Sequence, residues 1–216
     1  MEPLVWVLAL VFVFSFLSNV SPFVGASYTL FAVFYLTLIG PTSINFVAIV
    51  IVSAVGAALA KVVIYIGAFG FRGLLLRNRN VRLIGRYANT EAFYLVLFVT
   101  ALLPIFPFDD YIYIGAGATS ASLGLMAAVT LLAKVVKSGV EIALEYTILR
   151  DLSELFGIHR LDLTVLLTGV FIVIGVVVYK MDWEGVYGRI KGKGKVAAAT
   201  QTSAVSGRDS KGAGQL

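Results

Sequence analysis

Residues 44 to 69 constrain the fold most strongly, because this stretch contains only one charged side chain, Lys61. An apolar run longer than about 18 residues suits a helix that crosses a bilayer. Other apolar stretches cover residues 4 to 20, 123 to 149 and 163 to 179, and only 13% of the chain is charged. Soluble domains carry about twice that share. The sequence therefore predicts an all-α, polytopic membrane protein, with small residues suited to close helix contact at Ser53, Gly56, Ala57 and Ala60.

The basic residues predict the orientation of the chain. The loop from 71 to 87 holds five arginines and no acid, and the segment from Lys180 onward has seven basic residues against three acids. Basic segments beside membrane spans stay in the cytoplasm. We expect a membrane domain over residues 1 to 180 and a disordered, basic, cytoplasmic tail over 181 to 216.

The stretch from 92 to 118 breaks the rules for a membrane span. It places Pro104 and Pro107 in apolar sequence, and Asp109 and Asp110 follow directly. Two prolines make a continuous helix unfavourable, and buried carboxylates need a partner. Because the arginine loop and the tail lie on one side, an even number of crossings must separate them, so this stretch is expected to enter and return as a re-entrant hairpin. Alternatively, the aspartates only cap a helix that begins at Tyr111.

A short internal repeat suggests two related halves. Ala60-Lys-Val-Val63 recurs as Ala133-Lys-Val-Val136, and a proline-containing aromatic stretch precedes each copy, with Pro22 in the first. We expect repeat one over residues 18 to 70, repeat two over 91 to 149 and a last span over 163 to 179. The hairpins would then open to opposite sides as an inverted repeat. Hydropathy leaves open whether residues 23 to 38 cross the membrane or dip into it.

This arrangement resembles the DedA family, also called the VTT-domain or SNARE-associated Golgi protein superfamily. The resemblance lies in Gly56 through Gly67, which is similar to the family's glycine-rich helix, and in Leu103 through Gly117, which is similar to its second hairpin. This chain departs from the family pattern at Lys61, where an aspartate is common. The resemblance implies movement of a phospholipid or a polyprenyl-phosphate carrier across the bilayer.

Six charged residues form the predicted substrate-binding site, and the hairpin breaks flank it. Lysine can bind a lipid phosphate as a point charge, and the aspartates would hold the lysines in the empty site or take a coupling proton. Lys61 and Lys134 could instead extend to an interface, and Lys137 with Glu141 could be only a structural ion pair. The binding residues are Lys61, Lys134, Lys137, Asp109, Asp110 and Glu141, and the breaks are at Pro22, Pro104 and Pro107.

Several functional classes are disfavoured by composition. The chain has no cysteine and one histidine, His159, so we expect no metal centre, no cofactor and no enzymatic activity. The net charge of +5 lies beside apolar spans, which argues against nucleic acid as a partner. We expect an integral protein of a prokaryotic plasma membrane that acts as a flippase or scramblase. A proton-coupled transporter of a small ion or solute, a membrane scaffold without cargo, and a homo-oligomeric state all stay open.

Overall fold

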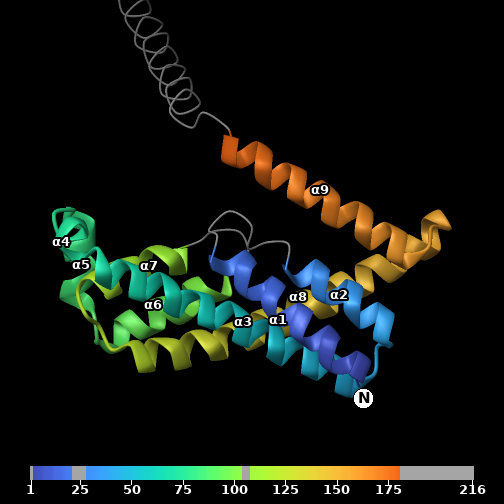
Figure 1. Ribbon diagram of the computed structural model, residues 1–216, viewed down its shortest axis with the longest axis horizontal. Coiled ribbons are helices and arrows are strands. Elements are labelled where there is room, and N and C mark those ends of the chain that lie inside the picture. The colour runs from blue at the N-terminus through green and yellow to red at the C-terminus, as the bar shows by residue number, and fades with distance from the viewer. Residues whose placement is uncertain (1, 21–27, 104–107, 181–216) are drawn as a thin grey trace, which may run out of the picture. The chain divides into compact units, whose positions relative to one another are not determined.

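The computed structural model describes residues 2 to 20, 28 to 103 and 108 to 180, and these residues form α-helices without any β-strand (Figure 1). The predicted all-α class is confirmed for this part of the chain. Two of the helices, α3 and α8, are long and apolar enough to cross a membrane. The helices are α1 (Glu2–Val20), α2 (Tyr28–Ile39), α3 (Ser43–Gly70), α4 (Arg72–Leu75), α5 (Arg79–Tyr87), α6 (Glu91–Leu102), α7 (Phe108–Ala118), α8 (Leu123–Phe156) and α9 (Arg160–Lys180).

Two predicted connections are helical instead. The arginine-rich segment from 71 to 87, expected as a loop, contains α4 and α5. The helix expected to end at Leu149 continues for two more turns to Phe156, where Gly157 takes a left-handed conformation with φ +65°. Glycine adopts that conformation without steric cost and so ends helices readily. The connector predicted over residues 150 to 162 therefore shrinks to the few residues before Arg160.

The helices form two sets of three, α1 to α3 and α6 to α8, which we call the two halves; the first half begins before residue 18, where repeat one was predicted to start. Within each half the first helix packs on the third, α1 on α3 and α6 on α8. Between the halves α3 packs along α8, and each middle helix crosses over, so that α7 lies on α3 and α2 lies on α8. The chain divides into the units Met1–Gly175 and Val176–Leu216, and all of these contacts lie within the first unit.

Helices α1 and α2 form one side-by-side pair, and α6 and α7 form another. In the first pair the rings of Phe14 and Phe31 stack with centroids 3.9 Å apart. In the second pair the Asn89 carboxamide, just before α6, accepts a hydrogen bond from the Ser122 amide after α7 at 2.8 Å. This bond brings the start of α6 next to the end of α7, so the two helices form a closed antiparallel hairpin.

Helices α1 and α3 approach each other closely because a glycine lies at their contact. A Cβ atom at Gly56 would lie 2.8 Å from the Phe12 carbonyl oxygen, which is too close for a side chain. At the same contact the Ser15 hydroxyl donates a hydrogen bond of 2.6 Å to the Ser53 carbonyl oxygen. The small residues predicted to allow close helix contact do so here, and this packing fixes the position of the α1 C-terminus against the middle of α3.

Candidate functional site

The two repeat lysines lie in the protein interior. Lys61 on α3 and Lys134 on α8 are each 3% exposed. Lys61 precedes the last residue of α3 by nine positions, and Lys134 follows the first residue of α8 by eleven, which correspond to about 14 Å and about 16 Å along the helices. Both ammonium groups bind carboxylates inside the protein. The alternative in which these side chains extend to an interface is therefore wrong.

The carboxylates come from the first turn of α7. Asp109 and Asp110 are 3% and 5% exposed, and α7 begins at Phe108 rather than at Tyr111. The aspartates do lie in the first turn of a helix, as the alternative expected, but this helix begins at Phe108 and both side chains also bind lysines.

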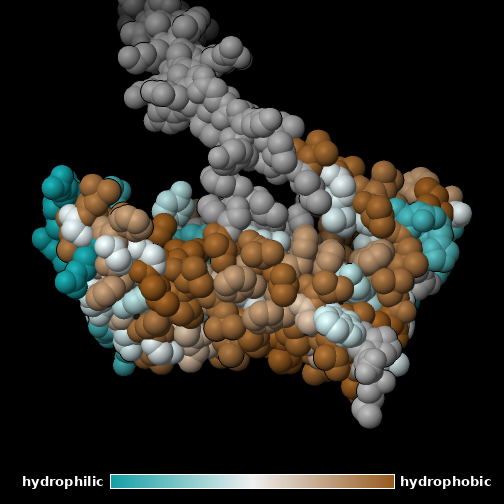
Figure 2. All heavy atoms as spheres, viewed as in Figure 1, coloured by the Kyte–Doolittle hydropathy of each residue, from teal (hydrophilic) through white to brown (hydrophobic). Residues whose placement is uncertain are grey.

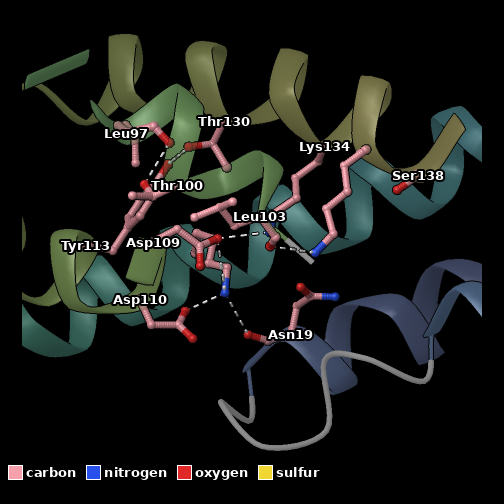
Figure 3. Close-up of polar contacts among 12 residues, drawn as sticks. Asn19, Leu97, Thr100, Leu103, Asp109, Asp110, Tyr113, Thr130, Lys134 and Ser138 are labelled. Carbon is pink, nitrogen blue, oxygen red and sulfur yellow. Dashed lines mark hydrogen bonds and ion pairs between the residues drawn. The ribbon is translucent and has the colours of Figure 1, made fainter. Parts of the chain in front are cut away.

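One carboxylate is shared between the two halves of the chain. Lys134 Nζ lies 2.9 Å from Asp109 Oδ2, and Lys61 Nζ lies 3.6 Å from the same oxygen. Lys61 Nζ also forms an ion pair and hydrogen bond with Asp110 Oδ1. We call these four residues, Lys61, Asp109, Asp110 and Lys134, the central charge cluster; Figure 3 shows its aspartates and Lys134 close together.

Helix ends add to the electrostatics of the central charge cluster. Lys61 Nζ lies 3.5 Å from the Asn19 backbone oxygen in the last turn of α1 (Figure 3). The last carbonyl groups of a helix have no intrahelical partner and carry partial negative charge, and the first turn carries partial positive charge. The ammonium group of Lys61 therefore meets the negative end of α1, and the carboxylates of Asp109 and Asp110 lie at the positive end of α7.

The cluster has two positive and two negative groups, so its formal charge is zero. Each ion buried in a protein loses hydration worth several kcal/mol, which only good pairing offsets. Apolar side chains would fill the same space without that cost. The cluster therefore costs more desolvation free energy than apolar packing of the same helices would, and a functional role is a testable reason for it.

Lys137 and Glu141 form a second pair on α8. Lys137 Nζ lies 3.8 Å from Glu141 Oε1 and donates a hydrogen bond of 3.3 Å to the Leu103 carbonyl oxygen at the end of α6. Lys137 thus contacts the C-terminus of α6 as Lys61 contacts the C-terminus of α1. These two predicted site residues lie beside the central charge cluster rather than in it.

The face of α8 that carries Lys134, Lys137 and Glu141 also contacts α2. Ser138 is buried and its hydroxyl lies 3.1 Å from the Tyr28 hydroxyl, and Thr29 donates a hydrogen bond of 2.7 Å to Glu145 Oε1. The other oxygen, Glu145 Oε2, is buried and has no hydrogen-bond partner among the residues that the structure describes. Lys134 and Ser138 on this face are buried, so the face turns toward the protein interior.

Sequence reasoning missed three groups at this site: the Asn19 carbonyl, Tyr28 and Thr29. The contact of the Asn19 carbonyl with Lys61 depends on where α1 ends, which the sequence pattern does not give. Tyr28 and Thr29 lie in an aromatic-rich stretch that carries no signal for contact with α8. The three predicted break residues, Pro22, Pro104 and Pro107, lie outside the described residues. His159 is exposed between α8 and α9, away from the buried residues of the cluster.

Comparison with protein-family models, with curated proteins and with solved structures found no match to this chain.

Proposed function

We propose that this chain is a polytopic membrane protein of the DedA type that moves a phosphate-bearing lipid between leaflets, as a flippase or scramblase. The observation that carries the proposal is that matched lysines from the two halves, Lys61 and Lys134, share the carboxylate of Asp109 in the interior. A site built equally by two halves is typical of transporters with inverted repeats. The cargo would be a phospholipid or a polyprenyl phosphate.

Helix lengths support membrane insertion with re-entrant hairpins. Helices α2 and α6 have 12 residues and α7 has 11, which give about 16 to 18 Å, against about 30 Å for the hydrocarbon core. Such helices reach only part of the way across. Lys61 lies about 14 Å from the C-terminal end of α3, and Lys134 lies about 16 Å from the N-terminal end of α8. Both distances are close to half of the thickness of the hydrocarbon core.

The surface of the described helices also supports a position within the bilayer. Figure 2 shows hydrophobic residues along the middle and hydrophilic residues gathered where α4 and α5 lie and near the junction of α8 with α9. Large apolar side chains are exposed on the long helices, such as Ile66 at 58% and Leu132 at 60%. We infer that α4, α5 and the tail are cytoplasmic, since the segment of α4 and α5 holds five arginines and the chain from Lys180 onward holds seven basic residues.

The mechanism follows from exchange of one anion for another. In the paired state Asp109 and Asp110 neutralise both lysines, so the central charge cluster carries no net charge. A lipid phosphate that enters would take the place of the carboxylates, because an ammonium group binds phosphate as a point charge. Asp109 and Asp110 would take up protons as they lose the lysines, so that no buried carboxylate is left charged and unpaired. Release of the phosphate would restore the pairs. The lysines would thus remain partnered in both states and the lipid headgroup would be stabilised at a depth where it is otherwise poorly tolerated.

An apolar groove favours a lipid cargo over a small solute. The groove has a volume of about 180 Å³ and lies between α3 and α8, on residues close in sequence to both lysines. A carrier for lipids needs such a surface beside its polar site, because the acyl chains stay in the hydrocarbon while the headgroup moves. The lining residues are Val55, Ala58, Leu59 and Val62 on α3 and Ala127, Ala128 and Leu131 on α8.

A proton-coupled transporter is the second candidate, supported by Glu145. A buried carboxylate oxygen without a partner, such as Glu145 Oε2, is a natural proton acceptor. Thr29 holds the other oxygen in place at 2.7 Å. In that case uptake of a small solute would follow an imposed proton gradient, and Glu145→Gln would abolish the coupling.

Purified protein in liposomes tests the proposal. Exchange of a headgroup-labelled phospholipid between leaflets should be fast with the wild-type chain and much slower with Lys134→Ala or Asp110→Asn. Asp151→Asn is the matched control, because Asp151 lies on the same helix as Lys134 but is exposed and, among the described residues, pairs with its neighbour Arg150 alone. A wild-type chain without exchange activity, or variants that all exchange at the wild-type rate, would contradict the proposal.

A further inference from the structure

Helix α5 has two distinct faces. Val81 is 9% exposed and faces inward with Ile84, which lies against α7 where Gly115 leaves room for it. Arg79, Arg82 and Arg86 follow each other at spacings of three and four residues, so they share the exposed face. Packing of the apolar face on α7 therefore fixes the direction in which the arginines point.

The three arginines line a cavity of about 280 Å³ together with Asn80 and Leu83. Arg82 is held in place, because its Nη1 donates hydrogen bonds of 3.0 Å to the Leu76 carbonyl oxygen and 3.3 Å to the Arg77 carbonyl oxygen. Within the described ranges, no ion pair joins any of the three guanidinium groups to an acid. The cavity thus concentrates positive charge that no acidic side chain of the described protein neutralises.

We propose that this cavity binds the phosphate headgroup of an anionic membrane lipid. The guanidinium group presents parallel donors that match phosphate oxygens, and arginine is preferred where phosphate is recognised. The cavity is slightly smaller than pockets that enclose whole drug-sized molecules, about 300 to 1,000 Å³, and it suits a headgroup whose chains lie outside. This inference needs a membrane surface but does not require that lipid moves through the central charge cluster.

The surroundings favour a lipid over a soluble phosphate. Large apolar side chains beside the arginines are exposed, with Phe71 at 70%, Leu74 at 66% and Leu83 at 50%. Figure 2 shows hydrophilic and hydrophobic residues mixed at the end where α4 and α5 lie. Basic residues interspersed with exposed apolar ones are typical of segments that lie in the membrane interface and attract anionic lipids.

Binding of short-chain lipids to the purified full-length protein in neutral detergent tests the proposal. The probes are a short-chain phosphatidate, glycerol phosphate, which is the same headgroup without chains, and a short-chain phosphatidylcholine. The wild-type protein should bind phosphatidate most tightly. Arg79→Gln combined with Arg86→Gln should weaken this binding about a hundredfold, because each lost charged contact to phosphate contributes about tenfold. Arg82 stays in place because it also holds the end of α4.

The control removes the same charge from the same end of the protein. Arg72→Gln combined with Arg77→Gln alters two exposed arginines that do not line the cavity, and it should weaken phosphatidate binding less than about fivefold. Equal losses in the two double variants would show general attraction to charge and overturn the proposed site, as would a wild-type protein that binds no phosphatidate. Glycerol phosphate that binds as tightly as phosphatidate would overturn the assignment to a lipid.

Discussion

The pairing of Lys61 with Asp110 makes a quantitative prediction about stability. Lys61→Met leaves Asp110 buried without the cation that binds it, whereas Asp110→Leu leaves Lys61 with Asp109 at 3.6 Å. The combined variant removes both members and leaves the pair of Lys134 with Asp109 at 2.9 Å intact. The three variants therefore separate the cost of an unpaired buried charge from the contribution of the pair itself.

The expected magnitudes follow from the burial of these groups. Removal of one partner of a buried ion pair costs about 3 to 5 kcal/mol, while replacement of both by apolar residues is often neutral or stabilising by about 1 to 4 kcal/mol. In a domain of this size, 1 kcal/mol corresponds to a shift of about 2 to 4 °C in Tm. Lys61→Met should therefore lower Tm by about 6 to 20 °C, and Asp110→Leu should lower it less because Lys61 keeps a second carboxylate.

Thermal unfolding in one detergent at a fixed scan rate measures these shifts, and the double variant should unfold near the wild-type temperature or above it. The reasoning fails if Lys61→Met is as stable as the wild type, or if the double variant loses the sum of the two single effects. Either result would mean that Lys61 and Asp110 do not interact in the interior.

Two further predictions concern packing and topology. Gly56→Ala should destabilise the protein by about 1 to 3 kcal/mol, because the new methyl group overpacks against α1. Gly67→Ala is the control and should be close to neutral, because open space surrounds its new methyl group. Thermal unfolding compares the two variants, and equal losses of stability would contradict the α1–α3 contact. Because the chain has no cysteine, Asn78→Cys and Leu155→Cys give single reactive positions near opposite ends of the helical unit. An impermeant maleimide added to intact cells should label position 155 but not position 78, and labelling of both or of position 78 alone would contradict the proposed topology.

Hydropathy predicted the apolar helices well because it measures the property that defines them. The long apolar stretch around Lys61 became α3, and the first stretch became α1. Hydropathy does not measure helical preference in polar sequence, so α8 was expected to end seven residues early. Residues 150 to 156 include arginine, leucine and glutamate, which are strong helix formers, and Gly157 is the first residue that stops the helix.

The arginine-rich segment carries local signals for α5 in addition to its charge. Asn78 accepts a hydrogen bond from the Asn80 amide at 2.8 Å, which is the contact expected of an N-cap. Val81 and Ile84 follow at helical spacing. A cap and an apolar face together predict the helix, but not its contact with α7, which depends on tertiary packing around Gly115.

The candidate site was predicted in part, because buried charges must find partners. The sequence alone indicated that the aspartates lie near Lys134, and the repeat indicated that Lys61 is related to Lys134. It could not indicate that Asp109 is shared by both lysines, or that the end of α1 lies beside Lys61. Those contacts depend on how the two halves cross over, which no local pattern encodes.

The central claim is that the buried charges exist to hold a lipid phosphate rather than to stabilise the fold. Headgroup exchange by the Lys61→Met/Asp110→Leu double variant tests this most directly, because that variant is expected to remain as stable as the wild type. The account predicts that the double variant, reconstituted at equal protein content and with an unchanged Tm, exchanges labelled lipid no faster than protein-free liposomes. Exchange at the wild-type rate would contradict the account and would show that the pair is structural only.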